Sequence, residues 1–153
     1  MSQKLVDRIR KGIGDKARRI DVRSPRRVYV DIAPNDLVDV VKYLFEDLRA
    51  RYVIASGVQV EDGFEVLHHF CFDADHVVVS VRVKAAPEKP EVPSVAPIIK
   101  GAEFIEREMH DLLGIEFPGH PNLTRLILAE DWPEGVYPLR RGKPWEGKVS
   151  QQL

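Results

Sequence analysis

The feature that most constrains the fold is a strict alternation of apolar side chains in the middle of the chain. In residues 76–84 every second position is a valine, at Val77, Val79, Val81 and Val83. This period of two is typical of a β-strand with one buried face. Residues 27–32, 53–61 and 64–72 have similar runs of β-branched and aromatic residues. We therefore predict four strands and a sheet with a well-defined buried face.

A two-residue turn joins the second and third of these runs. Asp62-Gly63 lies between them, and both residues tolerate positive φ, so a type I′ hairpin is predicted. In the strand that follows, His68 and His69 point to opposite faces and cannot jointly bind a metal ion. We expect both rings to pack or to form hydrogen bonds.

Two amphipathic helices complete the predicted core. Pro34 ends the first strand, Asn35 or Asp36 can cap a helix, and the apolar stripe then continues to about residue 50. In the second helix the apolar positions recur at steps of four and three: Ile98, Ala102, Ile105, Met109 and Leu112. Gly114 follows directly and suits the left-handed conformation that ends a helix.

This order of elements predicts an α+β two-layer sandwich, a β-α-β-β-β-α plait that is a variant of the ferredoxin-like fold, with an extended C-terminal tail. We divide the chain into a basic N-terminal arm with a short helix (1–26), the sheet core (27–86), a proline-rich spacer in polyproline II conformation (87–97), the signature helix and turn (98–121) and a docking tail (122–153).

The arm is strongly basic although the whole chain has a net charge of −1. It would either dock on a partner protein, nucleic acid or anionic lipid, or remain a solvated tail. Cys71 is the only cysteine, so no internal disulfide and no cluster held by cysteines of this chain alone is expected. The sequence has no apolar run of membrane-spanning length and no signal-peptide core, and we expect the cytoplasm.

The charged flank of the second helix is either a solvated face or a functional surface. Its spacing allows ion pairs of Glu103 with Arg107 and of Glu106 with His110. A metal site at Glu106, His110 and His120 is not expected, because di-iron helices place Glu and His three residues apart. No activated nucleophile or phosphate-binding loop is evident, so an enzyme acting by itself is not expected.

The tail has too little apolar pattern to form its own core. Trp132, Tyr137 and Trp145 could anchor it, and we expect it to lie on another subunit.

Several linked motifs resemble the 30 kDa (C) subunit of respiratory complex I, a family shared with membrane-bound energy-converting [NiFe] hydrogenases and related archaeal complexes. The motifs are Glu106-Arg107-Glu108, Asp111-Leu112-Leu113-Gly114-Ile115 and Gly119-His120-Pro121, flanked by Pro93-Ser94-Val95 and by Pro138-Leu139-Arg140. The chain departs from the family at Phe104, Leu113, Asn122 and Thr124, where tryptophan, phenylalanine, aspartate and arginine are common. The run His110–Gly114 is closer to the hydrogenase-type members.

The resemblance implies a non-catalytic assembly subunit without a cofactor, in the hydrophilic arm of a membrane-bound, ion-translocating oxidoreductase complex. The implied complex is a membrane-bound hydrogenase or a related ferredoxin-oxidising complex, with this subunit peripheral on the cytoplasmic side of the membrane. The implied partners are a large catalytic subunit and a small Fe–S subunit, which hold the Fe–S clusters and a quinone site or NiFe centre; the membrane arm is contacted only indirectly. The 30 kDa subunit of a true NADH-quinone oxidoreductase is the alternative within the family. A ferredoxin-like RNA-binding module is the alternative of another class, but no nucleic acid is expected. The implied interface residues are Glu106, Arg107, Glu108, Asp111, Gly114, Phe117, Gly119, His120, Pro121, Trp132, Tyr137, Pro138, Leu139 and Arg140.

Overall fold

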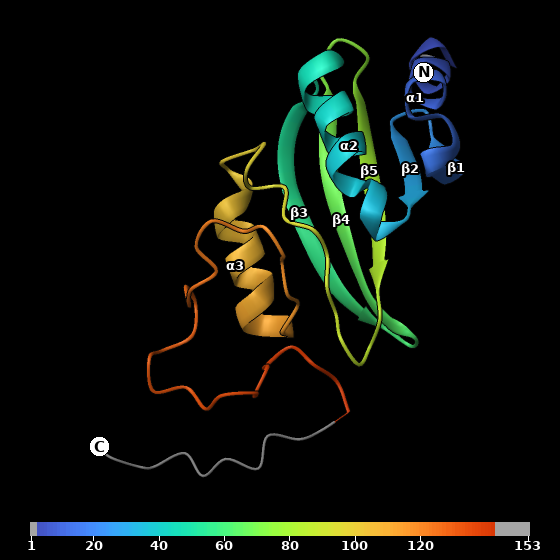
Figure 1. The fold of residues 1–153 in the computed structure, drawn as a ribbon. Helices are drawn as coiled ribbons and strands as arrows, with labels where there is room; N and C mark the ends of the chain where they lie inside the picture. The colour runs from blue at the N-terminus through green and yellow to red at the C-terminus, as the bar shows by residue number, and fades with distance from the viewer. Residues whose placement is uncertain (1–2, 143–153) are drawn as a thin grey trace.

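A computed structural model describes residues 3–142, and Figure 1 shows its helices and strands. The described chain contains, in order, α1 (Gln3–Ile13), β1 (Ala17–Ser24), β2 (Arg27–Ile32), α2 (Leu37–Lys42), β3 (Arg51–Val60), β4 (Gly63–Phe72), β5 (Val77–Ala85) and α3 (Ala102–Leu113). Short 3₁₀ turns at Gly14–Lys16 and Pro34–Asp36 precede β1 and α2. The α+β class predicted from the sequence is confirmed.

The five strands form one mixed sheet with the order β1-β2-β5-β4-β3. Only β2 and β5 run parallel, with Val30 opposite Val81, and all other neighbours are antiparallel. The β-α-β-β-β-α plait predicted from the sequence is not confirmed, because α1 and β1 precede those elements and add an edge strand. The sheet therefore ends in β1 on one side and in β3 on the other.

The core lies on the face of the sheet toward α2 and α3 (Figure 1). The alternating residues of β5 and β2 are all buried on this face, and so are Phe64, Val66, His68, Phe70 and Phe72 of β4. Leu37, Val40 and Val41 cover them from α2. The side chains that the alternation predicted to share one face of each strand therefore do share a face in the structure.

Strand β1 was missed in the sequence because its burial does not alternate. Its residues are exposed and half-buried in pairs, and two register shifts interrupt its pairing with β2. The segment predicted as a basic arm is therefore a helix followed by a paired strand. Four apolar residues of α1, Leu5, Val6, Ile9 and Ile13, are buried in the core, and the helix continues through Gly12.

The hairpin between β3 and β4 forms, but its predicted type I′ turn is wrong. Val60 is opposite Gly63, so the two loop residues are Glu61 and Asp62. Gly63 has φ +143°, whereas Asp62 does not adopt positive φ. A type I′ turn requires positive φ at both central residues, and here Gly63 instead begins β4.

Helix α2 is shorter than the predicted helix. It ends at Lys42 and continues as a π-helical turn, Tyr43–Asp47. Asp36 stands at the N-cap position without a side-chain hydrogen bond, so the predicted cap is not formed by it. Helix α3 begins at Ala102, and Ile98, which was predicted as part of it, lies in the turn before it. The helix is terminated by Gly114 with φ +69°, as the sequence predicts.

The proline-rich segment connects the sheet to α3 and is hydrogen-bonded to the chain that follows the helix. The Val92 N–H donates to the Glu116 carbonyl oxygen at 2.9 Å, and the Ser94 N–H donates to that of Pro118 at 2.9 Å. Val92, Val95 and Ile99 are buried in the core. The segment therefore pairs with the chain that follows α3 and holds it against the body of the protein.

Candidate functional site: the polar network of α3

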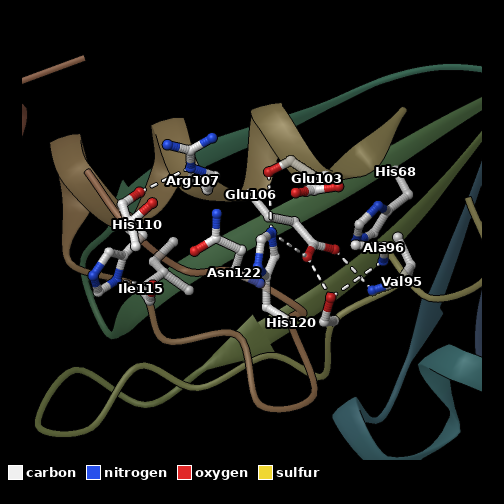
Figure 2. A network of polar contacts seen from close by, with 12 residues as sticks. His68, Val95, Ala96, Glu103, Glu106, Arg107, His110, Ile115, His120 and Asn122 are labelled. Carbon is white, nitrogen blue, oxygen red and sulfur yellow. Dashed lines mark hydrogen bonds and ion pairs between the residues drawn. The ribbon is translucent and has the colours of Figure 1, made fainter. Parts of the chain in front are cut away.

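Two carboxylates on the predicted charged face of α3 are buried. Glu106 is 0% exposed and Asp111 is 3% exposed, which excludes a fully solvated face. A buried carboxylate is costly unless several donors satisfy it. Figure 2 shows Glu106, Arg107 and His110 on the helix, in contact with segments before or after it, and His120, which approaches the helix from the segment that follows it.

Glu106 binds the segment that precedes α3. The Ser94 hydroxyl donates to Oε2 at 2.5 Å and the Val95 N–H donates to Oε1 at 2.8 Å. The Ala96 N–H donates in turn to the Ser94 hydroxyl oxygen at 3.2 Å. Desolvation raises the pKa of Glu106 above its ordinary value, against the opposing effect of these hydrogen bonds and of His120. The carboxyl group fixes Ser94–Ala96 against the middle of α3.

His120 holds the turn after α3 against the same helix. Its Nδ1 accepts the Asn122 N–H at 2.9 Å, so Nε2 is assigned as the nitrogen that carries a proton. Nε2 then donates to the Glu103 carbonyl oxygen at 3.0 Å and lies 3.9 Å from Glu106 Oε2. Figure 2 shows the ring of His120 directed at the helix between these two groups.

Asp111 binds the tail through three backbone N–H groups. Its Oδ2 accepts from Leu126 at 2.8 Å, Ile127 at 2.8 Å and Leu128 at 3.1 Å. Desolvation is the largest single influence and acts to raise the pKa of Asp111, but the three hydrogen bonds together lower it below its ordinary value. The ionised carboxylate therefore stabilises this bend of the tail.

Arg107 binds the adjacent carbonyl groups of the same bend. Its Nε donates to the Thr124 oxygen at 2.8 Å and its Nη2 to the Arg125 oxygen at 2.7 Å. The predicted pair of Arg107 with Glu103 is thus replaced by contacts with the backbone. The predicted pair of Glu106 with His110 is also not formed, because His110 Nδ1 faces the Ile115 carbonyl oxygen at 3.0 Å and the Glu116 carboxylate at 3.6 Å.

Arg140 caps the C-terminal end of α3. Its Nε donates to the Leu113 carbonyl oxygen at 2.6 Å and its Nη2 to that of Gly114 at 3.2 Å. A cation at this end of a helix also interacts favourably with the helix dipole. The guanidinium lies 4.4 Å from the centre of the Tyr137 ring and 5.1 Å from that of Phe64. A side chain at Gly114 would collide with Tyr137 and Arg140.

The other residues singled out in the sequence have different surroundings. Phe117 is buried in the core, whereas Gly119, Pro121, Pro138 and Leu139 are exposed. Trp132 is half-buried and donates its ring N–H to the Val136 carbonyl oxygen at 2.9 Å. Glu108 is half-buried and lines a groove of about 250 Å³ between α3 and β3. Trp145 lies outside the described residues.

The two histidines of β4 point to opposite faces, as predicted. His69 lies between the hydroxyls of Ser80, at 2.8 Å, and Ser56, at 3.1 Å. His68 is 0% exposed, with Nδ1 3.4 Å from the Tyr52 hydroxyl and Nε2 without a partner in the described chain. Desolvation lowers the pKa of His68 to about 3, so the ring is neutral.

Within residues 3–142, no three His, Cys, Asp or Glu side chains lie together as a metal site. Glu106 and His120 are neighbours, but His110 faces Ile115 instead. None of the helices in this range is long and apolar enough to cross a membrane.

The sequence did not predict the hydrogen bonds made by Gln59 and by the backbone of the tail. The Arg141 N–H donates to the Gln59 side-chain oxygen at 2.7 Å, which brings the tail to the edge strand β3. The acceptors of Arg107 and the donors to Asp111 are all backbone groups of residues 124–128. Backbone groups are present at every position, so no residue type in the sequence marks them as partners.

Comparisons with known proteins agree with this architecture. Residues 30–149 match the family model described as the 30 kDa subunit of respiratory-chain NADH dehydrogenase. The NADH-quinone oxidoreductase C subunit of Roseiflexus castenholzii is 37% identical over 121 residues, which cover 75% of this chain and 68% of that protein.

Two solved structures share the fold. A chain of the membrane-bound sulfane sulfur reductase, an archaeal respiratory membrane complex, superposes with a TM-score of 0.77 at 22% identity, covering 88% of this chain and 81% of that one. The trypsin-resistant fragment of Nqo5 superposes with a TM-score of 0.65 at 22% identity, covering 78% of this chain and 97% of that fragment. The chain belongs to the family of the 30 kDa subunit of respiratory-chain NADH dehydrogenase.

Proposed function

We propose that this chain is a non-catalytic assembly subunit in the hydrophilic arm of a complex I-like oxidoreductase. The observation that carries the proposal is that the charged groups on α3 form hydrogen bonds with other segments of the same chain. Glu106, Arg107 and Asp111 bind backbone or hydroxyl groups of the chain itself. Glu106 fixes the segment before α3, whereas Arg107 and Asp111 fix residues 124–128 of a tail that has no helix or strand over residues 122–142. A preformed contact surface requires such fixed segments.

The fixed tail presents apolar side chains to solvent. Ile127 is 53% exposed, Leu139 is 57% exposed and Phe104 on α3 is 61% exposed. Asp111 accepts the Ile127 N–H, so the backbone that carries this exposed side chain is held in place. Rigid apolar side chains with a polar surround are typical anchors of protein interfaces. We call the four exposed side chains of Phe104, Leu126, Ile127 and Leu139 the tail surface.

The partners that fit this role are the large catalytic subunit and the small Fe–S subunit of the complex. The Fe–S clusters and the quinone site or NiFe centre would belong to those neighbours, since a single cysteine cannot hold a cluster. The subunit would be peripheral on the cytoplasmic side of the membrane and would contact the membrane arm only through its partners. No nucleic-acid partner is expected for this subunit.

The type of complex is a second question. The relative from Roseiflexus castenholzii is named a subunit of NADH-quinone oxidoreductase, which favours a quinone-reducing complex. The run His110–Gly114 favours a membrane-bound hydrogenase or related ferredoxin-oxidising complex, which was our prediction from the sequence. The likeness to the sulfane sulfur reductase chain is one of fold. Nickel in the purified complex would identify a membrane-bound hydrogenase.

The assembly role is tested with Arg107→Ala in the complete complex. The variant loses both contacts with the Thr124 and Arg125 carbonyl groups, while the sheet core is untouched. We expect a folded subunit that retains roughly a tenth of the co-purifying partner subunits. Lys100→Ala, an exposed cation outside the network, is the control and should retain all of them. Full co-purification with Arg107→Ala would refute the proposal.

A further inference from the structure

The edge of the molecule opposite α3 carries a concentrated positive charge. Residues 3–27 include ten cationic and three acidic side chains, and they form α1, β1 and the turn into β2. The whole chain has 23 cationic and 24 acidic side chains, so the remainder is acidic. We call this region the basic edge. Because β1 and β3 end the sheet on opposite sides, the basic edge is remote from α3 (Figure 1).

Most cations of the basic edge are available to a partner. Asp39 pairs with Lys16, and Asp21 pairs with Arg19 and Arg23. The other cations are exposed and form no ion pair within residues 3–142: Lys4, Arg8, Arg10, Lys11, Arg18, Arg26 and Arg27.

These cations stand on a fixed scaffold and not on a free arm. The apolar side of α1 is buried, and the Tyr43 hydroxyl donates to the Arg8 carbonyl oxygen at 3.1 Å. The Tyr43 ring lies so close to Gly12 that any side chain there would collide with it. Strand β1 is paired with β2 from Ala17 to Ser24, with two register shifts. The backbone positions that carry the positive charges are therefore fixed, and binding a partner need not order this part of the chain first.

We propose that the basic edge is a second docking surface, which binds the acidic face of a partner protein. It is independent of the tail surface, because no network residue of α3 takes part in it. Charge complementarity would steer the partner and fix its orientation. Asp21 adds specificity, since it holds Arg19 and Arg23 in place at 3.6 Å and 2.7 Å.

The composition of the surface favours protein over a lipid bilayer or single-stranded nucleic acid. Helices that bind membranes insert an apolar face, but Leu5, Val6, Ile9 and Ile13 are all buried in the core. Proteins that bind single strands stack bases on aromatic rings, and residues 3–27 contain no aromatic side chain.

The test measures binding of the full chain to three anionic probes at physiological salt: a 20-residue polyglutamate peptide, a single-stranded RNA of equal charge and vesicles containing phosphatidylserine. We expect the peptide to bind more tightly than either other probe and to be released by salt. Reversing three charges, Lys4→Glu, Arg8→Glu and Lys11→Glu, should weaken peptide binding by about tenfold or more.

The control variant reverses two exposed cations on the segment before α3, Lys89→Glu and Lys100→Glu, and should bind the peptide like the wild type. Thermal unfolding establishes that each variant is folded. Tighter binding of RNA or vesicles than of the peptide would overturn the proposal, and so would equal loss in the control variant. A folded triple variant that binds the peptide normally would overturn it as well.

Discussion

The sheet core and the α3 region are held together by different kinds of interaction. In the sheet, Val30, Val81 and Phe70 are completely buried and pack against other apolar side chains. In the α3 region, Glu106 and Asp111 are buried as well, but they bind hydroxyl and backbone N–H groups of segments far along the chain. Apolar packing tolerates many arrangements, whereas directed hydrogen bonds specify one. The second region is therefore suited to fixing a contact surface.

The largest loss of stability is expected for Glu106→Ala. The variant leaves the Ser94 hydroxyl and the Val95 N–H buried without an acceptor, at a cost of about 4 kcal/mol in the free energy of unfolding. Glu103→Ala, one turn earlier on the same helix, is the matched control and should cost below about 1 kcal/mol. Urea denaturation measures both values. Equal costs would show that the buried carboxylate has no special role in the α3 region.

Asp111→Ala is expected to cost about 3 kcal/mol. Three N–H groups of Leu126, Ile127 and Leu128 lose a charged acceptor, but part of this loss is compensated because the bend lies at the surface, where water can replace it. Asp47→Ala, at an exposed site after α2, should change stability little. If Asp111→Ala unfolds at the same urea concentration as the wild type, the tail is held by other contacts.

Gly114→Ala is expected to cost about 2 kcal/mol. The residue has φ +69°, and a methyl group would lie 2.5 Å from the Tyr137 ring. Gly101→Ala, at φ −63° with open space around it, should be neutral and serves as the control. Thermal unfolding distinguishes the two. A stable Gly114→Ala variant would mean that the C-terminal end of α3 can rearrange.

The fold of the sheet core could be predicted from the sequence, but most of the α3 network could not. Alternation identified β2, β4 and β5 because each has one apolar face, while β1 was missed because its burial does not alternate. The spacing on α3 suggested ion pairs between neighbouring side chains. The actual partners of Glu106 and Arg107 are 11 to 18 residues away and mainly backbone groups, so only the three-dimensional arrangement reveals them.

The resemblance to a known family added what periodicity could not. It singled out Ser94, Glu106, Asp111 and Arg140, which the structure places at the contacts between α3 and its flanking segments. The assignment of these residues to a subunit interface remains a prediction. Burial of a carboxylate cannot be read from helical spacing, because the covering segment lies elsewhere in the chain.

The pH dependence of stability should be a smaller effect, and it should have opposite signs for the carboxyl groups of Asp111 and Glu106. The pKa of Asp111 is lowered on folding, so its contribution is present above the ordinary carboxyl range, near about pH 4, and is lost as the pH falls through the folded value. The pKa of Glu106 is raised, so its contribution is present below that range and is lost as the pH rises through its folded value.

The wild type should therefore lose more stability than Asp111→Ala between about pH 5 and pH 3. Denaturation at several pH values measures this difference. Parallel curves for the two proteins would contradict the proposed ionised state of Asp111.

The smallest effect on stability is expected at the tail surface. Phe104→Ser and Ile127→Ser remove exposed side chains and should change the free energy of unfolding by less than about 0.5 kcal/mol. The same variants should reduce co-purification of partner subunits, and Val53→Ser, 48% exposed on β3, is the control. Undiminished assembly of both variants would exclude the tail surface as an interface.

Hydrogen exchange of the full-length Arg107→Ala variant tests most directly whether α3 holds the tail independently of the sheet. The two contacts of Arg107 end on the Thr124 and Arg125 carbonyl groups, next to the N–H groups bound by Asp111. We predict that exchange at residues 126–128 rises about tenfold or more while exchange in β4 and β5 is unchanged. Unchanged exchange at residues 126–128, or an equal rise in the sheet, would contradict the account.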